Sequence, residues 1–231
     1  MKSLLPWAWR TFLLALCALV AVQFWFLVHI WHWADHNPET TAFMRGRLSI
    51  IRDDEPQARL AHRWVPYARI ALPLKQAVIA AEDANFMTHS GFDWEAMRRA
   101  HERNVKEGEI VVGASTISQQ LAKNLFLPSA RAWWRKAQEA AITVMLEAVL
   151  TKRRILEIYL NVAEWGDGIY GAEAAARYHY DVPAAALSPE QAARLAAMLP
   201  SPRSYTPRSD TLYLRERTAD LLSHMHLARI P

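Results

Sequence analysis

The longest uncharged stretch of the chain lies near its N-terminus. Residues 11–33 read TFLLALCALVAVQFWFLVHIWHW and contain no Asp, Glu, Lys or Arg. At about 1.5 Å of rise per helical residue, roughly 20 apolar residues cross the hydrocarbon core of a bilayer. Tryptophans cluster at both ends of the stretch, where amphipathic rings favour the membrane interface. The pattern therefore predicts a transmembrane helix over residues 11–33, after a tail of residues 1–10.

The charges on either side of this stretch predict how it crosses the membrane. Lys2 and Arg10 precede it. Asp35 and Glu39 follow it closely. The positive-inside rule then places the N-terminus in the cytoplasm and the rest of the chain outside. A cleavable signal peptide is the main alternative, but its apolar region would normally span about 7–15 residues and end in small side chains. A buried core helix, the third possibility, would show a polar face.

Beyond this anchor, the spacing of apolar residues is mostly helical. Residues 34–69 mix charges, prolines and scattered apolar positions, which indicates a juxtamembrane connection without regular structure. Residues 70–231 show apolar positions at i, i+3, i+4 and i+7 and predict one all-α domain. Asp93, Ser115 and Ser188 are placed to cap three of its helices. The predicted helices begin near Pro73 and cover about residues 94–106, 116–127, 132–150, 152–165, 189–199 and 210–227.

The composition agrees with one helical domain and an anchor. A chain of 231 residues, 52% of them hydrophobic, can bury one core of ordinary size. Seven glycines against ten tryptophans, with long Ala/Leu/Arg/Glu-rich stretches, favour helix. The single cysteine, Cys17, lies in the apolar stretch, which excludes an intrachain disulfide and a cysteine-based zinc site. The formal net charge of +4 permits nucleic acid, phosphate-bearing ligands or an anionic membrane as partners.

One carboxylate stands out in the segment AEDANFMTHSGFD, residues 81–93. Glu82 follows Val78 by one helical turn, at the edge of an apolar stripe and close to the predicted helix end. Burial at such a place raises the pKa of a carboxyl group toward the range useful for proton transfer. A glutamate at a helix boundary is more often simply solvated, and a lone His89 more often packs in a turn. This segment alone therefore leaves both interpretations open.

Two further segments carry polar groups on helices. In GASTISQQLAKN, residues 113–124, one helix face carries two amides and a lysine, which either bind sugars and phosphate oxygens or face water. In the third segment, Glu139 heads a largely apolar surface next to a basic cluster made of Arg131, Arg135 and Lys136. Such a cluster usually forms a plain ion pair with the carboxylate. At a site that handles pyrophosphate, it would neutralise the charge of the leaving group.

Together and in this order, the segments resemble the family-51 peptidoglycan glycosyltransferases. EDANFMTHSGFD is similar to the family motif EDxxFxxHxGfD, and GASTISQQLAKN to GGSTITQQLxKN. RKAQE and the later KRRILEIYLN are similar to RKxxE and KxxILExYLN. The resemblance covers about residues 70–205 and is closest to the monofunctional branch, since the chain has no S-x-x-K motif and no room for a transpeptidase domain. Ala114 and Ser118 depart from the pattern, where the family usually has glycine and threonine.

The resemblance implies a lysozyme-like helical glycosyltransferase domain that polymerises lipid II with inversion at the anomeric carbon and release of undecaprenyl pyrophosphate. Glu82 is then the general base, supported by Asp83, with Phe86 and His89 in the same motif. Glu139 is the second essential carboxylate, which organises nearby cations or holds a divalent metal such as Mg²⁺ or Mn²⁺. The residues expected to bind substrate or pyrophosphate are Ser115, Thr116, Gln119, Gln120, Lys123, Asn124, Arg131, Lys152 and Asn161.

The same resemblance implies where the protein works and with what. We expect a single-pass protein of the bacterial inner membrane, with its catalytic domain in the periplasm. Its partners would be lipid II, the growing lipid-linked glycan, the bilayer and other wall-synthesis or division proteins, without nucleic acid or an organic cofactor. Phe86, Trp133 and Trp134 are candidates for membrane contact or for core packing. A lysozyme-like lytic transglycosylase and a non-catalytic scaffold of wall synthesis are the competing functions.

Overall fold

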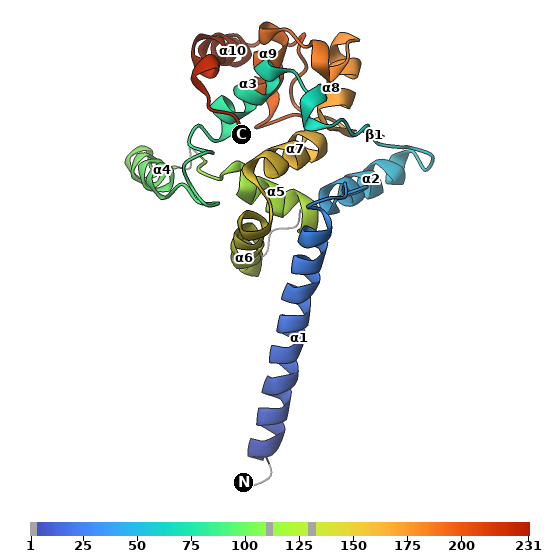
Figure 1. The fold of residues 1–231 in the computed structure, drawn as a ribbon, viewed down its shortest axis with the longest axis vertical. Coiled ribbons are helices and arrows are strands. Elements are labelled where there is room, and N and C mark those ends of the chain that lie inside the picture. Colours follow the sequence, from blue (N-terminus) through green and yellow to red (C-terminus); the bar gives the residue numbers. More distant parts are fainter. Residues whose placement is uncertain (1–3, 110–112, 129–132) are drawn as a thin grey trace.

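A long N-terminal helix projects from a helical domain (Figure 1). The computed structural model describes residues 4–109, 113–128 and 133–231. Helix α1 (Leu4–His32) contains a stretch, Trp7–His32, that is long and apolar enough to cross a membrane. Its side chains are largely exposed, with Leu14 at 70% and Trp31 at 71%. An apolar helix exposed in this way is not a core helix, so the prediction of a single anchor helix agrees with the structure.

The domain that follows consists of short helices and one small sheet. Its α-helices are α2 (Ala42–Asp54), α3 (Leu72–Glu82), α4 (Trp94–Glu107), α5 (Ile117–Phe126), α6 (Trp133–Val149), α7 (Lys152–Val162), α8 (Ala172–Tyr180), α9 (Pro189–Met198) and α10 (Leu212–His224). Short 3₁₀ helices are η1 (Tyr67–Arg69), η2 (Ala184–Ala186) and η3 (Met225–Leu227). The strands are β1 (Ala61–His62), β2 (Glu164–Gly166) and β3 (Ile169–Tyr170), in the order β1-β3-β2. The predicted all-α class holds apart from this sheet.

Capping residues explain several helix starts. As the sequence predicts, Asp93 caps α4 by accepting a hydrogen bond from the backbone N–H of Ala96. Gly108 ends this helix in the left-handed conformation. Ser188 forms the predicted capping box at α9. The prediction of Ser115 as the cap of α5 is wrong, because Thr116 forms the capping box there. The hydroxyl that caps must precede the first helical residue directly, and α5 begins one residue later than predicted.

The structure differs from two other predictions. Residues 34–69 are not without regular structure, since α2 lies within them, capped by Thr41 and fixed to the core by the buried Met44. Helix α7 ends at Val162, before the predicted end at 165, because β2 and β3 form an antiparallel pair there. The turn between these strands contains Gly168, with a φ of 70°. Helix α8 follows directly and was not predicted.

The elements form two groups around a continuous core (Figure 1). Helices α8, α9 and α10 lie with α3 at the end of the domain farthest from the N-terminus. Helix α5 packs on α2, α6 and α7, in the group nearer the anchor. The end of α3 meets the start of α5 between the two groups, through a hydrogen bond from the backbone N–H of Ile117 to Asp83. The chemistry described below is located at this junction.

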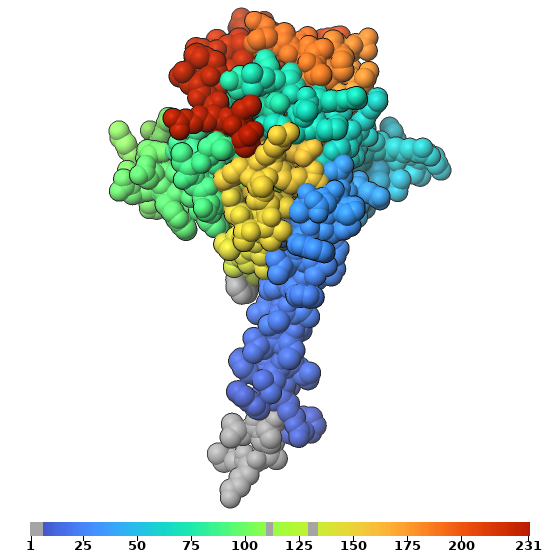
Figure 2. Space-filling model, in the orientation of Figure 1, coloured from blue at the N-terminus to red at the C-terminus, as the bar shows by residue number. Residues whose placement is uncertain are grey.

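The anchor packs directly against the domain, and Figure 2 shows it as a narrow stalk below a broad head. Phe26 and Ile30 on α1 are buried in the same core cluster as the domain, and the ring of Phe26 lies 5.0 Å from that of Phe126. Gln23 and Gln138 of α6 exchange two side-chain hydrogen bonds of 2.9 and 3.0 Å. The upper part of α1 therefore belongs structurally to the domain.

Candidate active site

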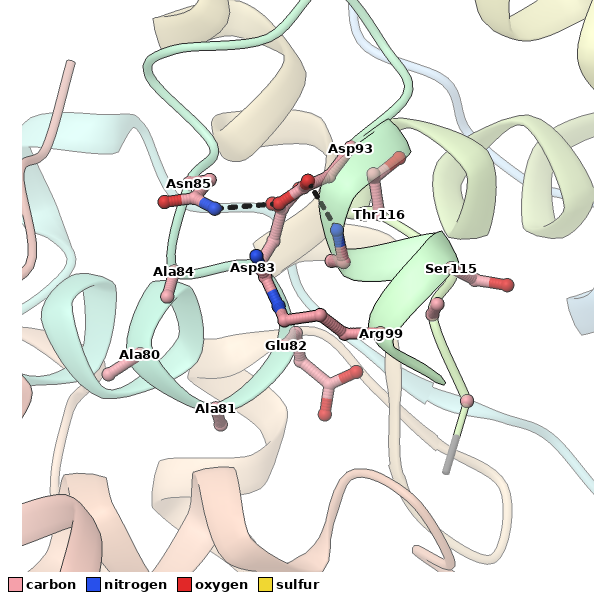
Figure 3. Close-up of a pocket in the computed structure, with 13 residues that line it drawn as sticks. Ala80, Ala81, Glu82, Asp83, Ala84, Asn85, Asp93, Arg99, Ser115 and Thr116 are labelled. Atoms are coloured by element: carbon pink, nitrogen blue, oxygen red, sulfur yellow. Dashed lines mark hydrogen bonds between the residues drawn. The ribbon is translucent and has the colours of Figure 1, made fainter. Parts of the chain in front are cut away.

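Glu82 occupies the last position of α3, where the buried side of the helix reaches a cavity. Leu74 and Val78, eight and four residues earlier on the same side, are fully buried. The Glu82 side chain is half-buried, and Figure 3 shows its carboxylate pointing into the cavity. Burial raises the pKa of this carboxyl group, while the hydrogen bond from Gln120 and the charges of Arg217 and Lys123 oppose the rise. A carboxylate in such surroundings is suited to accept a proton.

A chain of hydrogen bonds fixes one oxygen of Glu82. The Gln120 Nε2 amide donates to Glu82 Oε2 over 2.7 Å, and the Tyr159 hydroxyl donates to Gln120 Oε1 over 3.0 Å. Burial, followed by the negative charges of Glu82 and Asp83, raises the pKa of Tyr159 well above its ordinary value. Tyr159 therefore stays protonated and determines which end of the Gln120 amide faces Glu82. Glu82 Oε1 accepts no hydrogen bond from the described residues, so it is available to a ligand.

The loop after Glu82 is attached to α5 by its own side chains. Asp83 accepts hydrogen bonds from His89 Nε2 (2.8 Å) and from the backbone N–H of Ile117 (2.9 Å). Because His89 Nδ1 accepts from the backbone N–H of Gly91, the proton of the neutral ring must lie on Nε2. Gly91 has a φ of 91°, and a Cβ there would lie 2.8 Å from Thr143 Cγ2. Asp83 and His89 thus hold the loop, and their side chains are only 2% and 8% exposed.

The second carboxylate lies beside a lysine of α5. Glu139 on α6 is only 5% exposed and forms an ion pair with Lys136. Burial lowers the pKa of Lys123, the charge of Glu139 opposes this most strongly, and Glu82 opposes it weakly. Lys123 thus lies within the electrostatic reach of both Glu82 and Glu139. This arrangement supplies a positive charge close to a base.

Two cavities meet at the Glu82–Gln120 hydrogen bond. The first, here called the Glu82 cavity, is bordered by residues of α3, the following loop, α4 and the segment before α5, namely Ala80, Ala81, Glu82, Asp83, Ala84, Asn85, Asp93, Ala96, Arg99, Gly113, Ala114, Ser115 and Thr116. The second, here called the Lys123 cavity, is bordered by Phe43, Gln120, Lys123, Asn124, Tyr159, Val162, Ala163, Glu164, Tyr170, Leu199, Pro200 and Pro202. One is lined by hydrogen-bonding groups beside a base, and the other contains an ammonium group. The pair can receive a hydroxyl on one side and an anion on the other.

Comparison with known proteins agrees with this geometry. The transglycosylase family model matches residues 51–226. This chain belongs to the transglycosylase family. It is 54% identical to the biosynthetic peptidoglycan transglycosylase of Methylobacillus flagellatus, over 96% of this chain and 97% of that protein. It is 56% identical to the protein of the same name from Azoarcus sp., over 89% of each, and 51% identical to that of Herminiimonas arsenicoxydans, over 100% and 99%.

Some residues of the transglycosylase motifs form the framework of the site and border neither the Glu82 cavity nor the Lys123 cavity. Gln119 is 2% exposed, because its side chain closes the capping box with Thr116. Lys152 donates to Glu147 over 2.7 Å, and Glu147 also accepts a hydrogen bond from the buried Ser118. These polar groups satisfy one another within the domain. The polar face predicted for α5 is therefore partly a buried face.

Asn161 and Phe86 are likewise structural. The Asn161 side chain is fully buried and exchanges hydrogen bonds of 2.9 and 3.0 Å with the backbone of Val65. It joins α7 to the segment before η1 and borders neither cavity. Phe86 is 0% exposed, so it packs in the core, and contact with a membrane is excluded for it. Trp134 remains 46% exposed, whereas the side chain of Trp133 lies outside the described residues.

Among the other transglycosylase residues predicted to bind substrate, Ser115 borders the Glu82 cavity and Lys123 and Asn124 border the Lys123 cavity. Gln120 borders the Lys123 cavity and contacts the base itself. Thr116 borders the Glu82 cavity but is 3% exposed and donates its hydroxyl to the backbone of the loop. Arg131 lies outside the residues that the structure describes.

The structure adds residues to which the sequence assigned no part in the site. Tyr159 lies on the apolar side of α7 and, from its spacing, resembles any core tyrosine. Arg217 comes from α10, where it donates to the backbone carbonyl of Ala81 over 3.2 Å, next to the base. Asn85 and Asp93 border the Glu82 cavity and are joined by a 2.7 Å hydrogen bond (Figure 3). Tyr159 and Asp93 stand in the quoted motifs, and Asp93 was also predicted as a helix cap.

Proposed function

We propose that this chain is a membrane-anchored peptidoglycan glycosyltransferase that polymerises lipid II, with Glu82 as the general base. The observation that supports this most is the position of Glu82: a half-buried carboxylate of raised pKa, with one oxygen held by Gln120 and the other open to the cavity. The names of its close relatives point to the same activity. The match of the family model over residues 51–226 includes Glu82, Gln120, Lys123 and Glu139.

In the proposed step, the C4 hydroxyl of an acceptor GlcNAc enters the Glu82 cavity and attacks the anomeric carbon of the donor. The new C–O bond forms on the face opposite the donor's pyrophosphate, whose bond to the anomeric carbon breaks, so the configuration inverts from α to β. The hydroxyl proton passes to Glu82 Oε1, which accepts no hydrogen bond from the described residues. Base catalysis of this kind contributes typically about 10²–10⁴-fold in rate.

The leaving pyrophosphate requires positive charge. Lys123 borders the cavity on the other side of Gln120, and we assign the pyrophosphate to it and to Arg131. Since Glu139 opposes the lowering of the Lys123 pKa, it helps to keep this lysine charged. We assign to Glu139 the role of keeping Lys123 charged, in preference to the role of a metal ligand.

The residues present suit a divalent cation only together with the substrate. Among residues 4–109, 113–128 and 133–231, no group of three or more His, Cys, Asp or Glu side chains is placed to hold a metal ion. Mg²⁺ usually binds one or two carboxylates together with substrate phosphates. If Mg²⁺ or Mn²⁺ takes part, Glu139 would supply its carboxylate and the pyrophosphate the remaining charge. Such an ion would neutralise the leaving group.

The anchor fits an enzyme whose substrates are both tethered to lipid. We propose that α1 spans the inner membrane with its N-terminus in the cytoplasm and places the domain in the periplasm, following the charges on either side of it. Confinement to the same surface raises the effective concentration of enzyme and substrate.

Replacement of Glu82 by Gln tests the proposal. Glutamine keeps an oxygen that can accept the Gln120 hydrogen bond but cannot take a proton. The full-length protein in detergent should convert lipid II into glycan strands, and E82Q should lose about 10²-fold or more of that rate. A matched control is E190Q, an exposed glutamate at the start of α9, which should keep the wild-type rate.

Two results would contradict the proposal. A wild-type protein that solubilises pre-formed peptidoglycan and makes no polymer from lipid II would be a lytic enzyme. If the wild type has no polymerase activity and the Glu82→Gln variant keeps every other activity of the wild type, the function as a scaffold is favoured.

A further inference from the structure

A third cavity adjoins the Glu82 cavity. It has a volume of about 480 Å³ and is bordered by Asn85, Thr88, His89, Ser90, Phe92, Asp93, Trp94 and Glu95. Asn85 and Asp93 border both cavities, and Figure 3 shows the hydrogen bond that joins them. None of its residues borders the Lys123 cavity. A ligand bound beside Glu82 can therefore extend into this third cavity, away from Lys123.

Two aromatic rings form a platform in the third cavity. The rings of Phe92 and Trp94 stack with their centroids 5.3 Å apart and their planes 21° from parallel. Trp94 is 69% exposed, although indole rings of this domain such as Trp165 are almost completely buried. With one ring face against Phe92, the other face of Trp94 is open. An exposed aromatic ring at the edge of a cavity that leads to a reactive group is typical of a binding site.

The polar groups around the platform define the kind of ligand. Asn85 Nδ2 is used by Asp93, but Asn85 Oδ1 and the Ser90 hydroxyl make no hydrogen bond within the described part of the chain. Among the described residues, no Lys or Arg borders this cavity, whereas Asp93 and Glu95 do. A phosphate group would be repelled there. A neutral ligand with an apolar face and several hydroxyl or amide groups would be well matched, and a pyranose ring has both.

We propose that the Phe92–Trp94 platform is a saccharide subsite that binds one N-acetylated pyranose ring of the glycan beside the Glu82 cavity. The C–H face of the ring would stack on Trp94, and its hydroxyl or acetamido groups would bind Asn85 Oδ1 and Ser90. This inference rests on the proposed function. A bilayer is the less suitable occupant, because Figure 1 shows α6 closer than α4 to the membrane-spanning part of α1, with α4 level with α5.

Replacement of Trp94 tests the subsite in two independent assays on the full-length protein in detergent. The first assay measures the initial rate against the concentration of lipid II. The second follows binding of the soluble GlcNAc–MurNAc disaccharide by saturation-transfer NMR. W94A should raise the KM for lipid II about tenfold, as expected for loss of one anchoring aromatic ring. In the NMR assay, W94A should abolish the saturation-transfer signal of the disaccharide. W94F, which keeps an aromatic ring, should retain a KM close to that of the wild type and most of the disaccharide binding.

Tyr178→Ala is the matched control, since Tyr178 on α8 is also 69% exposed and borders another cavity. Y178A should leave KM and disaccharide binding unchanged. The subsite is overturned if W94A behaves as Y178A does. It is also overturned if W94A raises the KM only for lipid II that carries its peptide stem, because that result would indicate a peptide site. A rise of KM in W94A that is seen in lipid vesicles but not in detergent would indicate membrane contact and would overturn the subsite as well. A wild type without polymerase activity would refute the proposed function, while the disaccharide assay would still decide on the platform.

Discussion

The Tyr159 hydroxyl and Glu82 never touch, yet the tyrosine determines how the base is held. Tyr159 donates to Gln120 Oε1, so the Nε2 end of the same amide must face Glu82 Oε2. Without the tyrosine hydroxyl, the amide could rotate and present an oxygen to the carboxylate. The geometry of the base therefore depends on a residue buried in α7.

Tyr159→Phe should lower the rate of lipid II polymerisation about tenfold, because it removes one neutral hydrogen bond and leaves Gln120 Oε1 without a donor. The free energy of unfolding should fall by about 1 kcal/mol. Tyr67→Phe is the control, since it removes a 2.9 Å hydrogen bond from a buried tyrosine to the backbone of Pro231. Tyr67 borders neither the Glu82 cavity nor the Lys123 cavity. That variant should lose similar stability and keep its rate. Equal rates for Y159F and the wild type would contradict the role of the amide.

The rate should depend on pH through Glu82. Burial raises the pKa of this carboxyl group, and the base must be deprotonated to act. The acid limb of the profile of kcat/KM against pH should therefore lie above the ordinary glutamate value of about 4.3. An acid limb at or below that value would argue against Glu82 as the base.

The same raised pKa has the opposite consequence for stability. Between the unfolded and the folded pKa the native state binds more protons than the unfolded state, so the free energy of unfolding should fall as the pH rises through that window. E82Q lacks this titration. The stability of E82Q relative to the wild type should therefore increase from the low to the high side of the window, as measured by urea denaturation at several pH values.

Much of this site could be predicted from local sequence. Glu82 and Lys123 were indicated by short motifs, and Asp93 and Ser188 by capping patterns that depend on only a few neighbouring residues. Asn161 lies in an equally clear motif, but whether its amide serves the site or the framework depends on Val65, far away in the chain. A motif shows that a residue belongs to a site and does not distinguish a group that contacts a ligand from one that holds the fold.

The residues that were missed depend on tertiary packing. Tyr159 lies among the apolar positions of α7, so periodicity alone assigns it to the core. Arg217 reaches the base only because α10 packs on α3. The stretch that contains α2 includes Gly46 and several charges, which hide a helix stabilised by the burial of Met44. In each case the deciding contact is made by a segment distant in sequence.

Arg217→Met should move the acid limb to higher pH. The positive charge of Arg217 lowers the pKa of Glu82, so its removal lets burial raise that pKa further. Arg215→Met is the matched control on the same helix, because Arg215 is exposed and forms an ion pair with Asp210. The kcat/KM profiles of both variants against pH would be compared with that of the wild type. A shift of equal size in both would mean that the general charge of the domain, and not Arg217, sets the titration.

The contact between Gln23 and Gln138 should couple the anchor to the domain. Each single replacement by leucine leaves the partner amide without its two hydrogen bonds in an apolar place, whereas the double variant leaves no unpaired amide. Thermal unfolding in lipid nanodiscs should therefore show a smaller loss for the double variant than the sum of the two single losses, with a coupling energy of about 1 kcal/mol. Thr11→Val is the control, since the Thr11 hydroxyl donates to the carbonyl of Ala8 within α1 and to no other described residue. Paired with Q138L, it should show strictly additive losses. Additive losses for Q23L and Q138L as well would mean that the anchor is a flexible tether, and the height of Glu82 above the bilayer would then not be fixed by this contact.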